Sequence, residues 1–440
     1  MKLYNFLVLI LIVLLASCGR KRSMDAVSIP TTTEEWAHHL FDTSGVHSGL
    51  FVIEAGQSER PKPILDYHSS SLFTPASNTK ILTLYSALQF LPETLVGVKW
   101  IRRNDTLFFK GTGDPGFLDP RFDVSPPLSF FRQQNNLVYL GEWNSDERWA
   151  PGWSWEDYPY YYAAQRSPFP IYGNMARTWC QDDQWLMEPS GFIMNRYFDP
   201  SARAVRRNER ANIFQVNTAK CRETPLRIPF VTNPDVVCHL LSDTLHQAVE
   251  WTDLSGFNHD SGSWQSVPGS DRDTLLRAMM YESDNFIAEQ MLWSVSSALW
   301  DTISTTRVID SVMTDDFSPW KGKIHWVDGS GLSVYNKLSP RFLVDVLQRL
   351  YGSMEHGELL RYFPAGGVRG TIASWYGHDD MPFVYAKTGT LSGVHCLSGY
   401  LLADSGKTYV FSFMHNNYLG SSSQYKKKMD VLLRWIKENH

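Results

Sequence analysis

The chain has 440 residues, of which 43% are hydrophobic and 20% are charged, and its formal net charge is -5. This composition is typical of a globular protein with enough material for two domains, and the acidic balance gives no reason to expect a nucleic-acid partner. The sequence shows no internal repeat and no low-complexity tract.

The N-terminus has the features of a targeting segment. Lys2 precedes an apolar run over residues 6–16, which is too short for a comfortable membrane span and is typical of a signal peptide. Residues 15–18 (Leu-Ala-Ser-Cys) resemble a bacterial lipoprotein box, which predicts that the signal peptide 1–17 is cleaved and that Cys18 carries a lipid. The alternative is an ordinary signal peptide followed by an incidental cysteine. No other apolar run reaches membrane length.

The first candidate for chemistry follows two predicted strands near residues 49–53 and 64–67. Ser77 and Lys80 are three residues apart at the start of a predicted apolar helix, so both side chains lie on one helix face. Such a lysine can activate a serine nucleophile if burial favours the neutral amine, since its unperturbed pKa is about 10.4. The plainer interpretation is a serine N-cap beside a solvated lysine.

The segment from residue 95 to 265 reads as strands and loops, with a hairpin signal at Asn104 and Asp105. Many of the tryptophans and tyrosines of the chain lie between residues 143 and 162. Aromatic clusters of this kind suit either core packing or stacking against sugars, and packing is the commoner use.

A second polar motif, Ser283, Asp284 and Asn285, interrupts two helical apolar patterns and is predicted to form a turn. The Ser283 hydroxyl can relay a proton to a leaving group, and the Asn285 amide can hold both a substrate backbone and a catalytic lysine. The same three residues are also ordinary turn and capping composition.

A third motif, residues 387–390, opens a predicted meander of β-strands that ends near residue 413. Lys387 and the hydroxyls of Thr388 and Thr390 suit a terminal carboxylate, and Gly389 allows close approach. The backbone N–H groups of Ser77 and Thr390 are candidates for an oxyanion hole. A solvated strand edge with a turn glycine is the alternative.

Four cysteines remain after Cys18, and their pairing cannot be chosen from the sequence. Cys396 falls in a predicted core strand and suits a buried thiol, so a bridge is expected among Cys180, Cys221 and Cys238. No spacing of cysteines and histidines predicts a zinc site, and the proposed chemistry needs no metal or organic cofactor.

The spacing of the three motifs predicts a discontinuous catalytic domain, because the first interval is about twice as long as the second. We expect catalytic segments at 18–92 and 266–440, separated by an inserted β-rich domain at 93–265, with an amphipathic helix near residues 426–437 closing the chain.

Taken together, the three motifs resemble those of the serine penicillin-recognising enzymes, and in particular the class C low-molecular-mass penicillin-binding proteins. Three further segments, residues 111–115, 328–333 and 363–371, resemble stretches of the same family. Thr390 replaces the commoner serine but keeps the hydroxyl, and Thr112 replaces a glycine outside the expected site. The resemblance covers roughly residues 35 to 415.

The resemblance implies an α+β protein with a β-lactamase/transpeptidase-like catalytic domain, in which helices flank an antiparallel sheet. It also implies a D-alanyl-D-alanine carboxypeptidase or endopeptidase that acts on peptidoglycan stem peptides in the periplasm and is acylated by β-lactams. Ser77 would be the nucleophile, Lys80 the base, Ser283 the proton shuttle, Asn285 an orienting residue, and Lys387, Thr388 and Thr390 the carboxylate site.

Two other functions use the same residues. A β-lactamase would need a deacylating glutamate between the second and third motifs, where Glu355 and Glu358 are the candidates but lie in no recognisable deacylation motif. A non-catalytic lipoprotein that only binds cell-wall peptides would keep the fold without the reaction.

Overall fold

A computed structural model of the protein describes residues 30–42, 45–57, 62–122, 125–141, 148–257, 263–377 and 381–440. The predicted signal peptide 1–17 and Cys18 lie outside these residues. Within the described ranges, no helix is both long and apolar enough to cross a bilayer.

A five-stranded antiparallel sheet carries the third motif at its edge, in the order β14-β15-β16-β1-β2. The N-terminal strand β1 lies between β16 and β2, so the two ends of the chain build one sheet. The predicted meander and the two predicted N-terminal strands are confirmed. The strands are β1 (His47–Glu54), β2 (Leu65–Tyr67), β14 (Val384–Leu391), β15 (Val394–Leu402) and β16 (Thr408–Asn416).

Helices cover both faces of this sheet because the strands alternate their buried side chains. Phe51 and Ile53 pack into one apolar cluster with α3, α6, α7, α8 and α9, whereas Leu50 and Val52 pack into another with α2 and α11. The helices are α2 (Thr33–Phe41), α3 (Lys80–Phe90), α6 (Arg272–Tyr281), α7 (Asn285–Trp300), α8 (Thr305–Asp315), α9 (Pro340–Ser353), α10 (His356–Leu360) and α11 (Ser423–Asn439).

A second five-stranded sheet, in the order β12-β5-β4-β3-β13, is built from the segment between α3 and α6. The predicted hairpin is confirmed: β3 and β4 are antiparallel neighbours, and Asn104 in the turn has a positive φ of 51°, a conformation that asparagine tolerates. The elements are β3 (Thr94–Arg103), β4 (Thr106–Gly111), α4 (Ser125–Arg132), β5 (Asn136–Gly141), α5 (Pro234–Leu245), β12 (Val249–Asp253) and β13 (Gln265–Asp271).

Two three-stranded sheets complete this β-rich insert, in the orders β11-β6-β7 and β8-β10-β9. A Cys180–Cys221 disulfide lies beside the first of them, as expected for a bridge that excludes Cys396. Cys238 and Cys396 are free and buried. The strands are β6 (Met175–Gln181), β7 (Gln184–Glu188), β8 (Ile193–Tyr197), β9 (Val205–Arg207), β10 (Ile213–Asn217) and β11 (Leu226–Pro229).

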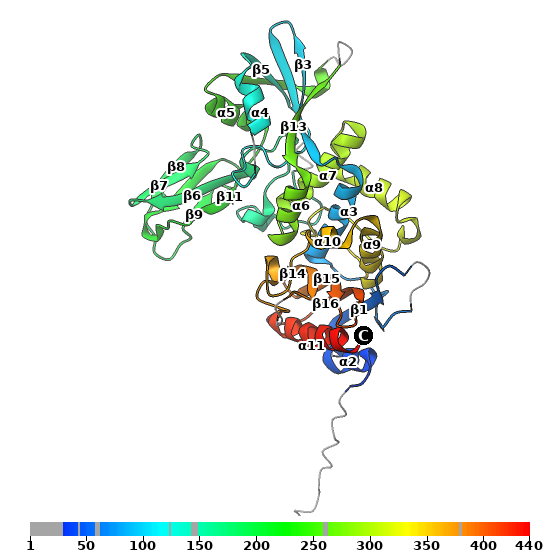
Figure 1. Ribbon diagram of the computed structural model, residues 1–440. Helices are drawn as coiled ribbons and strands as arrows, with labels where there is room; N and C mark the ends of the chain where they lie inside the picture. The colour runs from blue at the N-terminus through cyan, green and yellow to red at the C-terminus, as the bar shows by residue number, and fades with distance from the viewer. Residues whose placement is uncertain are drawn as a thin grey trace, which may run out of the picture.

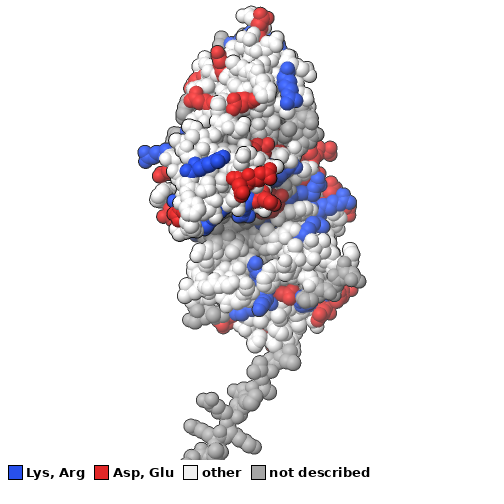
Figure 2. Space-filling view, turned by 90° about the vertical axis from the view of Figure 1, so that its left-hand side faces the viewer, with Lys and Arg blue, Asp and Glu red and all other residues white. Residues whose placement is uncertain are grey.

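The molecule is elongated, with the insert above, the helices α3, α6 and α7 in the middle, and the β14-β15-β16 sheet below (Figure 1). On the face shown in Figure 2, acidic and basic side chains are interspersed among larger uncharged areas.

The sheets and helices confirm the predicted mixed α+β fold with an inserted β-rich part. The limits 18–92, 93–265 and 266–440 stay a prediction; β13 pairs with β3 of the insert and leads directly into α6.

Candidate active site

Ser77 lies in a single 3-10 turn, η1 (Ala76–Thr79), that runs directly into α3. The turn passes closely over a neighbouring loop, because a Cβ at Gly331 would come within 1.8 Å of the Ala76 carbonyl oxygen. Ser77 is partly exposed, whereas Lys80 and most of α3 are buried. The fold thus presents the serine hydroxyl to solvent and keeps the lysine behind it.

Lys80 Nζ has three oxygen neighbours at hydrogen-bond distance. It lies 2.6 Å from Asn285 Oδ1, 2.7 Å from the Ser330 carbonyl oxygen and 3.0 Å from Ser77 Oγ. The first two oxygens only accept, so they take two N–H groups of the amine. A neutral Lys80 therefore directs its lone pair toward the Ser77 hydroxyl, as a general base requires.

The orientation of Asn285 is fixed by the insert. Its Nδ2 donates to the Tyr162 carbonyl oxygen at 2.9 Å, which leaves Oδ1 facing Lys80. Asp284 caps α7 by accepting from the Ile287 backbone N–H at 3.0 Å. Ser283 precedes this cap with a positive φ of 58°, which is uncommon for a serine. The predicted turn between two helices is confirmed.

Strand β14 brings the third motif against the other two. Lys387 Nζ lies 2.9 Å from Ser283 Oγ, and the Asn78 side chain donates to the Lys387 carbonyl oxygen at 3.1 Å. Gly389 is required here, because a Cβ would meet the Pro75 carbonyl oxygen at 2.4 Å and the Ser77 nitrogen at 3.0 Å. Residues from three distant parts of the chain therefore meet within hydrogen-bond distance.

Both lysines lie in surroundings that disfavour their charge. Burial lowers the pKa of Lys80 to about 8, although Asp328, Asp284 and Glu289 act in the opposite direction. Burial and the positive charge of Lys80 together hold the pKa of Lys387 well below its usual value. A neutral Lys80 is accordingly available near neutral pH, which the unperturbed side chain would not provide.

A cleft of about 1010 Å³ opens beside these groups. Ser77, Ser283, Asn285 and Thr390 line it, whereas the Thr388 hydroxyl bonds instead to the Thr371 hydroxyl at 2.8 Å. The opposite wall comes from the insert and includes Trp153, Asp157, Tyr161, Tyr162 and Arg227. The cleft is large enough for a peptide rather than a single amino acid.

His395 was not identified from the sequence. It is fully buried on β15, and its Nδ1 lies 2.9 Å from the Thr390 hydroxyl oxygen. Burial lowers the pKa of His395 to about 3, so the ring stays neutral in the physiological range. The ring fixes the position of the Thr390 hydroxyl without adding a charge to the predicted carboxylate site. The sequence feature that could have indicated His395 is its place in the predicted hairpin, where it pairs with Thr390 across β14 and β15.

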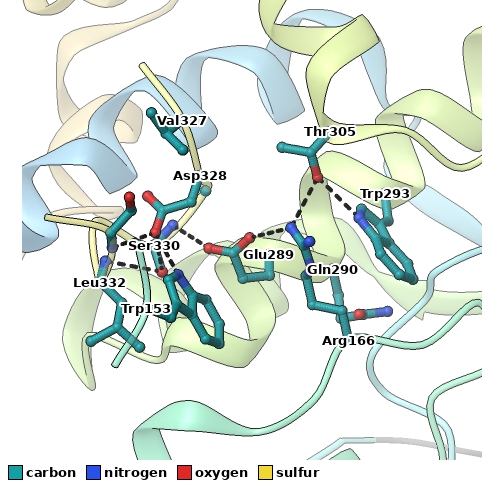
Figure 3. A network of polar contacts seen from close by, with 12 residues as sticks. Trp153, Arg166, Glu289, Gln290, Trp293, Thr305, Val327, Asp328, Ser330 and Leu332 are labelled. Carbon is teal, nitrogen blue, oxygen red and sulfur yellow. Dashed lines mark hydrogen bonds and ion pairs between the residues drawn. The ribbon is translucent and has the colours of Figure 1, made fainter. Parts of the chain in front are cut away.

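A buried carboxylate network behind Lys80 was also missed (Figure 3). Glu289 accepts from the Ser330 backbone N–H at 2.8 Å and pairs with Arg166 at 3.1 Å. Asp328 accepts from the Gly331 backbone N–H at 2.8 Å and from the Trp153 indole N–H at 2.9 Å. These bonds fix the loop whose Ser330 carbonyl holds Lys80.

The two glutamates considered for deacylation lie elsewhere. Glu355 caps α10 by accepting from the backbone N–H groups of Gly357 and Glu358 at 2.8 Å, and both glutamates are exposed. Neither lines the cleft. Among the described residues, no group of three or more histidines, cysteines, aspartates and glutamates is placed to hold a metal ion.

Comparison with known proteins agrees with this geometry. The model of the D-Ala-D-Ala carboxypeptidase 3 (S13) family matches residues 33–439. The chain belongs to this family. The S13 assignment is supported by 30% identity over 168 residues to the D-alanyl-D-alanine carboxypeptidase DacB of Haemophilus influenzae, an alignment that covers 37% of this chain and 35% of the relative.

Alignments with the first sequence relatives of this S13 chain thus span only about a third of each relative. The fold agrees over a longer range. The crystal structure of penicillin-binding protein 4 (dacB) from H. influenzae has a TM-score of 0.71 at 20% identity, covering 93% of this chain and 100% of that one. The complex of the same H. influenzae protein with a novel β-lactam gives a TM-score of 0.66 at 18% identity, with the same coverage.

The predatory endopeptidase Bd3459 of Bdellovibrio bacteriovorus, in complex with its immunity protein, gives a TM-score of 0.52 at 13% identity, covering 89% of this chain and 92% of that one. Likenesses at this identity show the shared fold.

Proposed function

We propose that the protein is a serine D-alanyl-D-alanine carboxypeptidase or endopeptidase that cleaves peptidoglycan stem peptides through an acyl-enzyme. The observation that carries this proposal is the arrangement around Lys80, whose two fixed acceptors leave its lone pair to Ser77. Membership of the S13 family and the β-lactam complex of a structural neighbour support it.

In the proposed reaction, Ser77 Oγ attacks the carbonyl carbon of the penultimate D-alanine while Lys80 takes the hydroxyl proton. The backbone N–H groups of Ser77 and Thr390 hold the developing oxyanion. Protonated Lys80 returns this proton by way of the Ser283 hydroxyl to the departing amine, so that the C–N bond breaks and the terminal D-amino acid, or the second stem peptide of a cross-link, leaves. Water then hydrolyses the ester on Ser77.

The substrate carboxylate is assigned to Lys387 and Thr390, with Thr388 supporting the strand behind them through its bond to Thr371. Asn285 orients Lys80. A β-lactam presents a similar carboxylate and carbonyl, so these drugs are the expected covalent inhibitors. The positions of Glu355 and Glu358 speak against the β-lactamase alternative, and the complete set of polar groups speaks against a non-catalytic binding protein.

Labelled penicillin tests the nucleophile. The parent protein should form a covalent adduct on Ser77, and Ser77→Ala should lose it while keeping the melting temperature of the parent. An adduct that persists on Ser77→Ala would place the nucleophile elsewhere. Digestion of purified muropeptides with mass analysis then separates the two activities, because a carboxypeptidase releases D-alanine whereas an endopeptidase divides cross-linked dimers.

For location, we propose that the enzyme works in the periplasm and is held to a membrane by lipid on Cys18 alone. The support for this proposal is the sequence of residues 15–18 together with a substrate that lies outside the cytoplasm.

A further inference from the structure

A second cavity, of about 360 Å³, lies in the insert beside the catalytic cleft. Its wall is rich in aromatic side chains, with Trp149, Trp153, Trp155 and Tyr158 among the lining residues. These come from the aromatic segment that the sequence suggested for either packing or sugar stacking. The proposed peptide reaction uses none of Trp149, Trp155 and Tyr158.

The exposure of these side chains argues against simple packing. Trp155 is 71% exposed and Trp149 is 40% exposed, although an indole gains more than most side chains from burial. A single exposed tryptophan needs no explanation, but two in the wall of one cavity mark a surface that a ligand can cover.

The wall of the cavity also holds polar and charged side chains that can donate or accept hydrogen bonds. Gln165 is only 2% exposed, and its Oε1 accepts from the Thr232 backbone N–H at 2.9 Å. That bond fixes the orientation of the amide. Glu209 brings a negative charge to the wall, and Arg148 and Arg210 bring positive charges. Flat apolar faces with fixed polar groups of both kinds match a pyranose ring that carries hydroxyl and N-acetyl groups.

The cavity is connected to the catalytic cleft through shared residues. Trp153 and Ser154 line both, and the Trp153 indole N–H is held by Asp328 Oδ2 at 2.9 Å. The Ser333 hydroxyl donates to the Pro151 carbonyl oxygen at 2.6 Å, which attaches the same segment to the catalytic part. A ligand in the aromatic cavity therefore has a fixed position relative to Ser77.

We propose that this aromatic cavity is a saccharide subsite that binds an N-acetylated amino sugar of the glycan strand while the attached stem peptide occupies the cleft. The inference rests on the proposed function for its choice of ligand, because a peptidoglycan fragment carries a sugar and a peptide in one molecule. The subsite favours stem peptides that are still attached to glycan over free peptides.

The test compares two substrates of the full protein: a free pentapeptide ending in D-alanyl-D-alanine, and the same pentapeptide on its disaccharide. Trp155→Ala should lower kcat/KM for the disaccharide-peptide about tenfold, the loss of one good stacking contact, and leave the free peptide unchanged. Trp155→Phe keeps an aromatic face and should retain most of the preference. Phe198→Ala, which removes another aromatic of the insert with 73% exposure, is the matched control and should change neither substrate.

An unchanged ratio in Trp155→Ala, or an equal loss on both substrates, would overturn the saccharide subsite. The proposed function fails in a different way, if the parent releases D-alanine from neither substrate. Binding of the peptide-free disaccharide, followed by tryptophan fluorescence in Ser77→Ala and in the Ser77→Ala, Trp155→Ala double variant, then decides the subsite alone. Quenching in the first protein and none in the second supports it, and quenching in both or in neither overturns it.

Discussion

Lys80 combines complete burial with two carbonyl-type acceptors, which is the arrangement that turns a lysine into a base. Burial lowers the pKa of the side chain to about 8, and the neutral form keeps its hydrogen bonds to Asn285 and Ser330. The negative charges of Asp328 and Glu289 oppose the effect of burial, so the pKa of Lys80 does not fall far below neutral pH.

This pKa predicts how acylation depends on pH. Protonated Lys80 cannot accept the Ser77 proton, so the acylation rate should rise about tenfold per pH unit below pH 8 and level off above it. The measurement is the second-order rate of penicillin labelling between about pH 5.5 and 9.5, corrected for uncatalysed hydrolysis of the β-lactam. Lys80→Ala should lose several orders of magnitude at every pH. A flat profile in the parent would contradict the assignment of Lys80 as the base.

At the scale of secondary-structure elements, the loop around Gly331 fixes the position of the turn that carries Ser77. Gly331 has a φ of +80° and lies so close to Ala76 that no side chain fits between them. Asp328 holds the loop from the other side through the Gly331 and Ser333 backbone N–H groups, at 2.8 and 2.7 Å. The position of the proposed nucleophile thus depends on a segment about 250 residues away in sequence.

Gly331→Ala should slow penicillin acylation on the order of a hundredfold, because a displacement of about 1 Å at the turn disturbs the geometry of attack. Gly322→Ala is the matched control: its φ is +76°, yet nothing lies within 4 Å of the added Cβ. That variant should lose about 1 kcal/mol of stability from backbone strain and keep its acylation rate. Equal rates in the two variants would show that the close contact at Gly331 is unimportant.

The sequence predicted those features that arise from local patterns. The Ser77 helix, the turn at Ser283, the hairpin at Asn104 and the meander that begins at β14 all follow from residue spacing within about 10 positions. The contacts of Glu289, Asp328 and His395 could not be predicted in this way. Each depends on a partner brought close by the tertiary fold, and a buried carboxylate in a sequence looks the same as an exposed one.

At the scale of the whole molecule, a cluster of charges beside the second motif joins the insert to the catalytic part of the chain. Arg121 pairs with Asp119 at 2.7 Å, with Asp284 at 2.8 Å and with Glu282 at 2.9 Å, and Arg177 adds a second cation to Asp119 at 3.0 Å. Burial alone would raise the pKa of Asp284, but Arg121, the Ile287 backbone N–H and Arg227 together outweigh burial and hold that pKa below its usual value. The insert therefore stabilises the ionised cap of α7.

Arg121→Gln should destabilise the fold by about 3 kcal/mol, because it leaves two largely buried carboxylates short of a cation. The loss should show as a lower melting temperature at pH 7 and shrink in acid, where the carboxylates take up protons. Slower acylation should accompany it, since Ser283 directly precedes the affected cap. Lys407→Gln, which removes an exposed pair with Glu54, should leave the melting temperature nearly unchanged. Similar melting temperatures in the two variants would contradict the role of Arg121.

The lipid proposal is tested at the same scale by Cys18→Ser. We expect this variant to move from the membrane to the soluble envelope fraction while keeping its penicillin labelling, because Ser77, Ser283 and Lys387 all belong to the folded part of the chain. Fractionation followed by labelling of each fraction is the measurement. Unchanged membrane retention of Cys18→Ser, or an uncleaved N-terminus in the parent, would refute the anchor and leave the catalytic assignment standing.

The position of β1 between β2 and β16 sets the order in which the molecule can be completed during synthesis. Strand β1 emerges early, but its longer neighbour, β16, is made only after the whole insert and ends at Asn416. Until then, one edge of β1 has no native strand to pair with and can attach to other chains. A ribosome that stalls shortly before β16 would therefore leave an aggregation-prone product in which the insert can already be folded but the catalytic sheet is open.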